Sequence, residues 1–462
     1  MIWTVEQIAG ITGGSLNGRG GVQVRGISTD TRTLKPGDLF VALRGGNFDG
    51  HEFIEQAIRA GAAACLSGES VVGHEVPVVL VSDTLRALGD LAAYLRKEFD
   101  GPVVAITGTS GKTTTKEMVA AILATTGRGH KTAGNYNNLI GLPLTLFGVK
   151  QEHQWLVLEM GMSSRGEIAR LSEIAAPTIG LITNVGEGHL DSLGGVEGVA
   201  RAKGELFAAI PAGGTAVVNC DDARVMQLPV ANGVKRITYG MDLESLDVTV
   251  RVLEEDANGS RIELSTEAGT VDLRLEAPGV HQVRNAVAAA AVGTALNVSL
   301  EKISRGLEAF RPASGRMEPC TLGNDILLLD DTYNANPLSM RAALETLKNL
   351  AAGDGRFALL GDMLELGEDA AELHREIGEV AAGCVDALVS LGAHAEEVAK
   401  AAIGAGLNTK RVFVARDHAE AVDKLQGWLK KGSRILVKGS RGMQMEQACG
   451  LLKERLGNGE AD

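Results

Sequence analysis

The sequence predicts an α/β protein of three domains. Its 462 residues are about three times the length of a typical domain. Glycine occupies 59 positions and aromatic residues make up only 3%, which suits tight turns between strands and helices and cores of small aliphatic side chains. Apolar runs of strand length alternate with helix-length segments along most of the chain, and this alternation is typical of a mostly parallel sheet.

Residues 1–100 are expected to form a small N-terminal α/β domain. Residues 38–43 and 76–81 have the apolar composition of strands, with a helix pattern between them. An amphipathic stretch over residues 84–98 predicts a second helix, which Asp100-Gly101-Pro102 would end. We therefore place the first domain boundary at about residue 100.

Residues 101–312 are expected to form a central domain around a parallel sheet, whose ligands bind at the carboxyl ends of the strands. Over residues 246–275, apolar and polar residues alternate around an Asn258-Gly259 turn, which predicts an antiparallel extension of the same domain. Helix patterns at about 282–296 and 300–310 close the domain. The parallel strands are predicted at 103–106, 155–158, 179–183 and 215–218.

Residues 313–462 are expected to form a C-terminal, Rossmann-like doubly wound domain. Helix-length segments separate its strand patterns, which lie at 326–329, 357–360, 387–390, 411–414 and 435–437. No G-x-G-x-x-G segment follows the first of these strands, so a dinucleotide is not its expected ligand.

Charge and cysteine content exclude several classes of protein. Forty-five basic against 58 acidic residues give a net charge of −13, which argues against a nucleic acid as the main partner. Five scattered cysteines without a C-x-x-C pair are typical of buried thiols in a reducing cytosol. No secretion signal and no run of about 18 apolar residues occurs. We expect a cytoplasmic protein, without a membrane span, that is a monomer.

The most specific motif is T-G-T-S-G-K-T-T at residues 107–114, between a strand and a helix pattern. Its glycines allow successive N–H groups and the helix N-terminus to face an anion, Lys112 can reach terminal phosphates, and the Thr113 hydroxyl can bind Mg²⁺. The general phosphate-loop pattern would have glycine where this chain has Ile106. The predicted nucleotide contacts are Gly108, Thr109, Ser110, Gly111, Lys112, Thr113 and Thr114.

This shorter loop resembles that of the ATP-dependent Mur ligases and their relative folylpolyglutamate synthase. Further segments resemble Mur ligase motifs in the same order and cover nearly the whole chain. They include residues 134–143, 159–162, 183–191, 202–205 and 281–286. The resemblance implies an ATP-dependent, ADP-forming amide ligase with Mg²⁺.

Three residues acquire catalytic or metal roles from this resemblance. It implies that Glu159 and His189 bind magnesium and that Lys203 is carbamylated. Addition of CO₂ would turn the lysine ammonium into an anionic carbamate, which provides an oxygen ligand or a hydrogen-bonding anchor beside a metal. Taken alone, Glu159 would more often be a solvated strand end, His189 a loop histidine and Lys203 a helix-surface lysine.

The same resemblance distributes the nucleotide contacts over two domains. It implies that Asn285 recognises adenine, that Arg316 contacts the phosphates and that Asp331 holds the ribose hydroxyls. A guanidinium makes bidentate phosphate contacts and a carboxylate accepts two hydroxyl hydrogen bonds, so the residue types fit. Gln282 stands where the family has asparagine. Closure of the two domains would complete the site.

Residues 331–340, D-T-Y-N-A-N-P-L-S-M, resemble the signature of the Mur ligase that adds D-alanyl-D-alanine to UDP-N-acetylmuramoyl-tripeptide. The D-N-P-R segment expected of the diamino-acid-adding ligase is absent. Taken alone, Asn334, Asn336 and Lys438 would most often be turn and surface residues. The resemblance implies that the first domain holds the UDP-sugar end of the substrate through Ser28, Asp30 and Arg32. The other substrate contacts that it implies are Asn135, Asn138, Asn334, Asn336 and Lys438.

The expected reaction proceeds through an acyl phosphate. The tripeptide carboxylate attacks the γ-phosphate of ATP, and the amine of D-alanyl-D-alanine then displaces phosphate. Three alternatives stay open: a diamino-acid-adding or folate-polyglutamating ligase, an ATPase that uses hydrolysis for switching, and a degenerate nucleotide-binding module.

Overall fold

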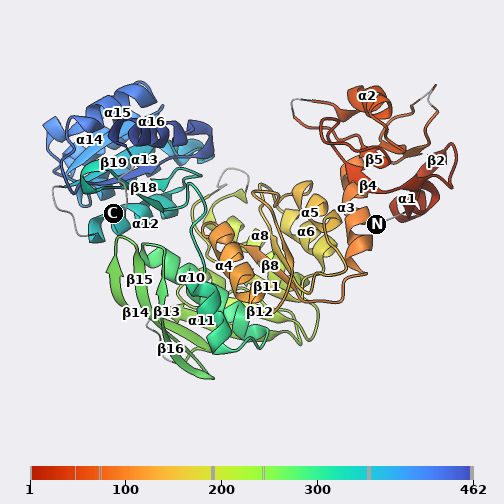
Figure 1. Ribbon diagram of the computed structural model, residues 1–462, viewed down its shortest axis with the longest axis horizontal. Coiled ribbons are helices and arrows are strands. Elements are labelled where there is room, and N and C mark those ends of the chain that lie inside the picture. Colours follow the sequence, from red (N-terminus) through yellow and green to blue (C-terminus); the bar gives the residue numbers. More distant parts are fainter. Residues whose placement is uncertain are drawn as a thin grey trace.

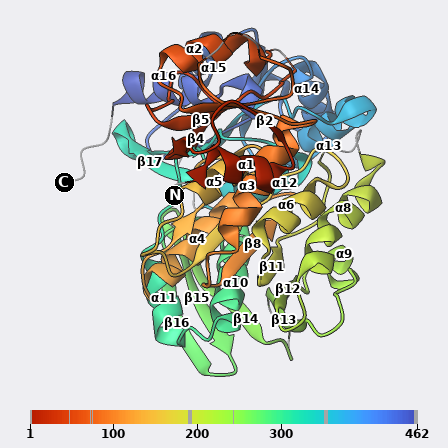
Figure 2. The same ribbon diagram turned by 90° about the vertical axis from the view of Figure 1, so that its right-hand side faces the viewer.

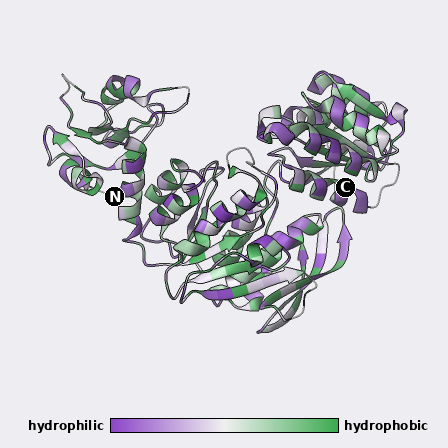
Figure 3. Cartoon of the chain, turned by 180° about the vertical axis from the view of Figure 1, so that it is seen from behind, coloured by the Kyte–Doolittle hydropathy of each residue, from purple (hydrophilic) through white to green (hydrophobic). Residues whose placement is uncertain are grey.

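The computed structural model describes residues 3–46, 48–71, 73, 75–188, 193–241, 243, 245–350 and 355–457. Over these residues the chain forms three α/β bodies, and the N-terminal and C-terminal bodies stand at opposite ends of the central one (Figure 1). Apolar residues concentrate in the strands, and the outer faces of the C-terminal helices are hydrophilic (Figure 3). The predicted three-domain α/β fold is confirmed.

The described part of the N-terminal body contains a five-stranded sheet of order β2-β7-β6-β5-β4, with a short ribbon of β1 and β3 beside it. The strands predicted at 38–43 and 76–81 are present as β5 and β7. The strands are β1 (Trp3–Thr4), β2 (Ser15–Asn17), β3 (Gln23–Val24), β4 (Gly26–Ser28), β5 (Asp38–Val41), β6 (Ala64–Ser67) and β7 (Val78–Leu80). The helices are α1 (Val5–Thr12), α2 (Ile54–Arg59) and α3 (Thr84–Arg96).

Helix α3 joins the N-terminal body to the central one. Leu88 and Leu91 lie in the N-terminal core, whereas Ala92 lies in a core cluster of the central domain. The Arg96 guanidinium donates hydrogen bonds to the carbonyl oxygens of Ala175 and Ala176, over 2.7 and 3.0 Å. The two bodies are thus connected by shared packing as well as by the chain.

The central sheet has nine strands in the described residues, in the order β16-β15-β14-β13-β12-β11-β8-β10-β9. Strands β14 to β16 pair antiparallel, as predicted. Strand β13 was not predicted, because its sequence K-R-I-T-Y-G-M mixes charged residues and glycine; parallel neighbours on both sides hold it. The strands are β8 (Val103–Thr107), β9 (His130–Lys131), β10 (Leu156–Glu159), β11 (Ile179–Ile182), β12 (Thr215–Asn219), β13 (Lys235–Met241), β14 (Val248–Asp256), β15 (Gly259–Thr266) and β16 (Gly269–Leu275).

Helices cover both faces of the central sheet. In Figure 2, α4, α10 and α11 lie on one side of the strands and α6, α8 and α9 on the other, in agreement with two separate apolar clusters. Helix α10 is rich in alanine, and these small side chains allow it to pack closely against α4. Most of its residues are therefore buried. The helices are α4 (Lys112–Ala124), α5 (Gly141–Phe147), α6 (Glu167–Ala175), α8 (Val196–Ala209), α9 (Ala223–Met226), α10 (Val280–Ala295) and α11 (Leu300–Glu308).

The C-terminal body is doubly wound, as predicted. Its described strands have the order β17-β18-β22-β19-β20-β21, with apolar clusters on both faces. Only the edge strand β17 pairs antiparallel, and it was not predicted. The strands are β17 (Glu318–Leu322), β18 (Ile326–Asp331), β19 (Arg356–Gly361), β20 (Ala387–Leu391), β21 (Val412–Ala415) and β22 (Arg434–Lys438). The helices are α12 (Pro337–Asn349), α13 (Ala370–Ala382), α14 (Ala395–Gly404), α15 (His418–Gln426) and α16 (Glu446–Leu456).

None of the helices in the described part of the chain is long and apolar enough to cross a membrane.

Candidate active site between the central and C-terminal domains

The predicted phosphate loop connects the end of β8 to the start of α4, as the sequence motif requires. Gly108 and Gly111 have φ angles of 153° and 80°, which L side chains rarely adopt. A Cβ atom at Gly108 would lie 1.8 Å from Thr183 Oγ1, and one at Gly111 would lie 2.3 Å from Asn285 Oδ1. Both glycines are therefore needed for the backbone conformation and for close packing.

The loop is held by the segment that follows β11. Asn184 accepts hydrogen bonds from Ser110 N through Oδ1 at 2.9 Å and from Thr109 N through its carbonyl at 3.1 Å. Thr183 Oγ1 donates to the Ser110 carbonyl at 2.6 Å. Both residues lie in a segment that resembles a Mur ligase motif, but the sequence analysis assigned them no role.

Lys112 curls back over the loop. Its Nζ donates to the Gly108 carbonyl at 2.7 Å and lies 3.4 Å from the Thr109 carbonyl. Burial lowers the pKa of Lys112, and the positive charge of Arg316 lowers it further. The nearby Glu159 carboxylate acts in the opposite direction, because it favours the charged ammonium. The ammonium is thus placed at the loop where an anion would bind.

Glu159 ends β10 beside the loop and is only 2% exposed. Its Oε2 accepts a hydrogen bond from Thr113 Oγ1 at 2.8 Å, and its Oε1 accepts one from Asn137 Nδ2 at 2.8 Å. The alternative of a solvated strand end is therefore wrong. The Thr113 hydroxyl and the Glu159 carboxylate are hard oxygen donors next to the phosphate loop, which fits the preference of Mg²⁺.

The predicted substrate residues Asn135 and Asn138 lie on either side of the residue that contacts Glu159, which is Asn137. Asn135 is exposed, and Asn138 Oδ1 accepts hydrogen bonds from Ile140 N and Gly141 N at the start of α5. Asn137, between them, contacts Glu159, and the sequence analysis gave it no role. The G-N-x-N-N segment signalled the loop but did not distinguish which asparagine turns inward.

Lys203 lies on α8 with 3% of its surface exposed, so the helix-surface alternative is wrong. Within the described residues its amine has no hydrogen bond or ion pair. Burial, and then the charge of Lys112, lower the pKa of Lys203 well below its ordinary value. Burial therefore favours the neutral amine, which is the nucleophilic form of lysine.

The third predicted metal ligand, His189, lies outside the described residues. Among the residues that are described, no group of three or more His, Cys, Asp or Glu side chains is arranged to hold a metal ion.

The C-terminal domain reaches the loop through Arg316. Its Nη2 donates to Thr113 Oγ1 at 2.9 Å, and its guanidinium lies 4.0 Å from the centre of the Tyr333 ring. A second contact joins Arg341 on α12 to Glu187 at 3.1 Å. The two domains therefore meet at the proposed phosphate site.

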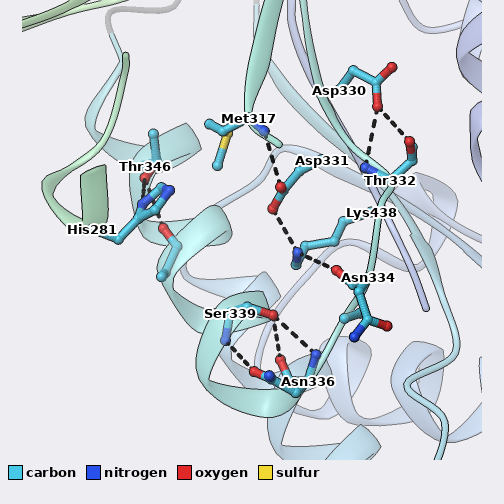
Figure 4. A network of polar contacts seen from close by, with 12 residues as sticks. His281, Met317, Asp330, Asp331, Thr332, Asn334, Asn336, Ser339, Thr346 and Lys438 are labelled. Atoms are coloured by element: carbon cyan, nitrogen blue, oxygen red, sulfur yellow. Dashed lines mark hydrogen bonds and ion pairs between the residues drawn. The ribbon is translucent and has the colours of Figure 1, made fainter. Parts of the chain in front are cut away.

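Asp331 and Lys438 form an ion pair at the ends of β18 and β22 (Figure 4). Asp331 Oδ2 accepts from Lys438 Nζ at 2.7 Å, and Asp331 Oδ1 accepts from Met317 N at 3.1 Å. Lys438 also donates to the Asn334 carbonyl at 2.9 Å and is 2% exposed. The surface alternative for Lys438 is wrong.

Asn336 is the N-cap of α12. Its Oδ1 accepts from Ser339 N at 2.9 Å, and the Ser339 hydroxyl accepts from Asn336 N at 3.0 Å (Figure 4). This reciprocal pair satisfies backbone donors at the helix start. In this structure the side chain of Asn336 thus orders the turn, as the residue taken alone would suggest.

Asn285, the predicted adenine contact, lies against the phosphate loop and is 7% exposed. Its Oδ1 accepts from Thr115 Oγ1 at 3.3 Å, and its Nδ2 donates to Gln282 Oε1 at 3.2 Å. Gln282, which replaces the family's asparagine, therefore orients the Asn285 amide.

The predicted UDP-sugar residues form a separate cluster on the N-terminal domain. Ser28 Oγ donates to the Asp30 carbonyl at 2.9 Å, and Arg32 binds the Asp30 carboxylate with its closest contact at 2.6 Å. Hydrogen bonds from Arg32 lower the pKa of Asp30 to about 2. The three residues lie together at the end of β4, away from the phosphate loop.

Comparison with known proteins agrees with this geometry. The Mur ligase middle domain matches residues 106–293, the Mur ligase glutamate ligase domain matches 315–441, and the catalytic domain of the Mur ligase family matches 23–96. The chain belongs to the Mur ligase family, as the resemblance implied.

Two curated relatives and two solved structures show which members of the family the chain resembles. The UDP-N-acetylmuramoyl-tripeptide–D-alanyl-D-alanine ligase of Escherichia coli (strain K12) is 37% identical over 98% of both chains. The enzyme of the same name from Synechocystis is 41% identical over 91% of this chain and 90% of its own. A crystal structure of MurF from Acinetobacter baumannii has a TM-score of 0.90 at 34% identity and covers 98% of this chain and 99% of its own. MurF from Thermotoga maritima, in complex with ADP, has a TM-score of 0.84 at 29% identity over 94% and 98%.

Proposed function

We propose that the protein is an ATP-dependent, ADP-forming ligase that adds D-alanyl-D-alanine to UDP-N-acetylmuramoyl-tripeptide in the cytoplasm, as a monomer, for peptidoglycan synthesis. The main support for this proposal is the arrangement at the phosphate loop, where Lys112, Thr113 and Glu159 of the central domain lie together with Arg316 of the C-terminal domain. Relatives that bear this activity in their names match nearly the whole chain.

The chain's own groups would bind and orient the nucleotide. The N–H groups of the loop and Lys112 hold the phosphates, Arg316 contacts them from the second domain, Asn285 recognises adenine and Asp331 holds the ribose. Thr113, Glu159 and His189 would hold magnesium, which when bound supplies positive charge against the phosphates.

The reaction then needs positioning and charge neutralisation more than a nucleophilic side chain. The tripeptide carboxylate attacks the γ-phosphorus, ADP leaves, and an acyl phosphate forms. The free amine of D-alanyl-D-alanine attacks the acyl carbon, loses a proton and expels phosphate. Ser28, Asp30 and Arg32 would bind the UDP end of the substrate. Asn135 and Asn138 would also contact the substrate. The side that receives D-alanyl-D-alanine would be formed by Asn334, Asn336 and Lys438.

Lys203 is proposed to be carbamylated. Burial lowers the pKa of its amine and so favours the neutral form, which is the form that attacks CO₂. The product is a carbamate whose negative charge would offset that of the neighbouring Lys112 ammonium. This removes the cost of two like charges near each other in a buried site.

An acceptor comparison tests the proposed function. Purified protein is supplied with ATP, magnesium and UDP-N-acetylmuramoyl-tripeptide, and ADP release is measured with D-alanyl-D-alanine, glutamate or diaminopimelate at equal concentration. We expect D-alanyl-D-alanine alone to stimulate release. Equal stimulation by another acceptor would favour another ligase, and full turnover without any acceptor or UDP-sugar peptide would show a plain ATPase.

A further inference from the structure

A second buried lysine beside the phosphate loop has no part in the proposed chemistry. Lys116 lies on α4, one turn after Lys112, and is 1% exposed. Its Nζ lies 2.9 Å from the Thr132 carbonyl, 3.2 Å from Glu117 Oε1 and 3.7 Å from Glu159 Oε2. The first contact is a hydrogen bond and the other two are ion pairs, so the ammonium is held by partners inside the protein.

The Glu159 carboxylate is held from several sides. Thr113 and Lys116 approach Oε2, while Asn137 donates to Oε1. Thr132 connects two of these elements, because its Oγ1 accepts from Glu159 N at 2.9 Å and its carbonyl accepts from Lys116. Lys116, Glu159 and Thr132, which directly follows β9, therefore form one connected unit.

The unit extends outward as alternating charges. Glu117, which pairs with Lys116, also pairs with Lys131 at the end of β9. The Lys131 side chain is 41% exposed, whereas those of Lys116 and Glu159 are 1% and 3% exposed. Lys131 thus shares Glu117 with Lys116 without an ion pair to Glu159, which makes it a matched control.

We propose that Lys116 is a positioning residue that holds the Glu159 carboxylate beside the Thr113 hydroxyl, so that both oxygen donors are in place for magnesium. The inference rests on the proposed role of Glu159 as a magnesium ligand. Groups behind a metal-binding carboxylate fix its orientation, and their loss weakens metal binding.

The sign of the effect separates positioning from simple charge compensation. A positive charge 3.7 Å from Glu159 Oε2 repels a cation, so its removal alone would tighten magnesium binding. Loss of orientation acts in the opposite direction. Positioning therefore predicts weaker magnesium binding when the Lys116 ammonium is removed.

The test measures binding rather than turnover. Calorimetry of ADP binding by the full chain, repeated over a series of Mg²⁺ concentrations, gives the concentration for half-maximal magnesium-dependent binding. We expect Lys116→Met to raise it about 10-fold to 100-fold, Lys116→Arg to restore part of the loss, and Lys131→Met to leave it unchanged. An unchanged or lowered value in Lys116→Met overturns the proposal.

Two further variants keep the result interpretable. If thermal unfolding shows that Lys116→Met does not fold, Lys116→Gln, which keeps a donor for the Thr132 carbonyl, is judged by the same criterion. Glu159→Gln tests the underlying assumption. If it leaves the magnesium requirement unchanged, the proposed metal role of Glu159 fails; if it raises the requirement while the Lys116 variants do not, only the positioning role is overturned.

Discussion

The Arg316 guanidinium donates a hydrogen bond to the hydroxyl of Thr113, over 2.9 Å and across the boundary between two domains. The same hydroxyl donates its single proton to Glu159. One threonine therefore links an arginine of the C-terminal domain to the candidate metal ligand of the central domain. Nucleotide binding and domain approach are thus connected at a single side chain.

Replacement of Arg316 should impair use of ATP without unfolding the protein. For Arg316→Ala we expect a loss of about 100-fold in kcat/KM for ATP, because the variant lacks the positive charge that we propose to contact the phosphates. Arg316→Lys should recover only part, since lysine lacks the planar group that lies over Tyr333. ADP release with both substrates measures this. Arg305→Ala, which breaks only a surface pair with Glu301, is the control, and equal activity of the Arg316 and Arg305 variants would contradict the role.

Lys112→Ala should abolish acyl-phosphate formation. Loss of the ammonium that lies over the loop should lower tripeptide-dependent ADP formation by about 1,000-fold. Rapid-quench measurement of the first turnover tests the step itself. Lys400→Ala, at an exposed ion pair on α14, should behave like the unaltered protein. Retained first-turnover ADP in Lys112→Ala would refute the phosphate-loop assignment.

Lys203 should take up CO₂. Carbon-13 NMR of protein equilibrated with labelled bicarbonate should show one carbamate signal that is missing in Lys203→Arg. Burial lowers the pKa of Lys203 and so favours the neutral amine, which is the form that reacts with CO₂. The signal should weaken as the pH falls and the amine becomes protonated. An identical spectrum for the arginine variant would place the modification elsewhere or exclude it.

His281 should make stability depend on pH. Burial lowers the pKa of His281 from 6.5 to about 4, although Asp331 favours its charged form. Between these values the unfolded chain binds more protons, so stability rises with pH. The neutral His281 side chain makes its full contribution to the free energy of unfolding above about pH 6.5. This contribution is lost as the pH falls towards 4. It amounts to at most about 3 kcal/mol.

Thermal midpoints between pH 4 and pH 8 test this prediction. The unaltered protein should lose more stability on acidification than His281→Gln, whose side chain does not titrate and can still reach Thr346, the present partner of His281 at 3.4 Å (Figure 4). Parallel curves for the two proteins would show that His281 does not contribute.

The phosphate loop, its flanking strand and helix, and the positions of most strands along the chain could be predicted from local patterns. Buried strands are continuous apolar runs, and the loop needs glycine at fixed positions, so both leave a signal within a few residues. The sequences of β13 and β17 contain no such apolar run. These strands form because they pair with neighbouring strands in the sheet, and that pairing cannot be read from the local sequence.

Individual contacts were harder to predict. Asn135 and Asn138 stay predicted substrate contacts. The contact of Asn137 with Glu159, and the roles of Lys116 and Asn184, were not predicted. Neighbouring asparagines in a loop look alike in sequence, and the side chain that turns inward depends on the strand across from it.

The sequence by itself determined the class of fold, the family and the residue types available for phosphate and metal chemistry. Tertiary structure alone decided that Glu159, Lys203 and Lys438 are buried rather than solvated. It also brought Arg316 to Thr113 although 203 positions separate them in the chain. The physical reason is that a charge's environment, and hence its pKa and partners, is set by groups distant in sequence that fold around it.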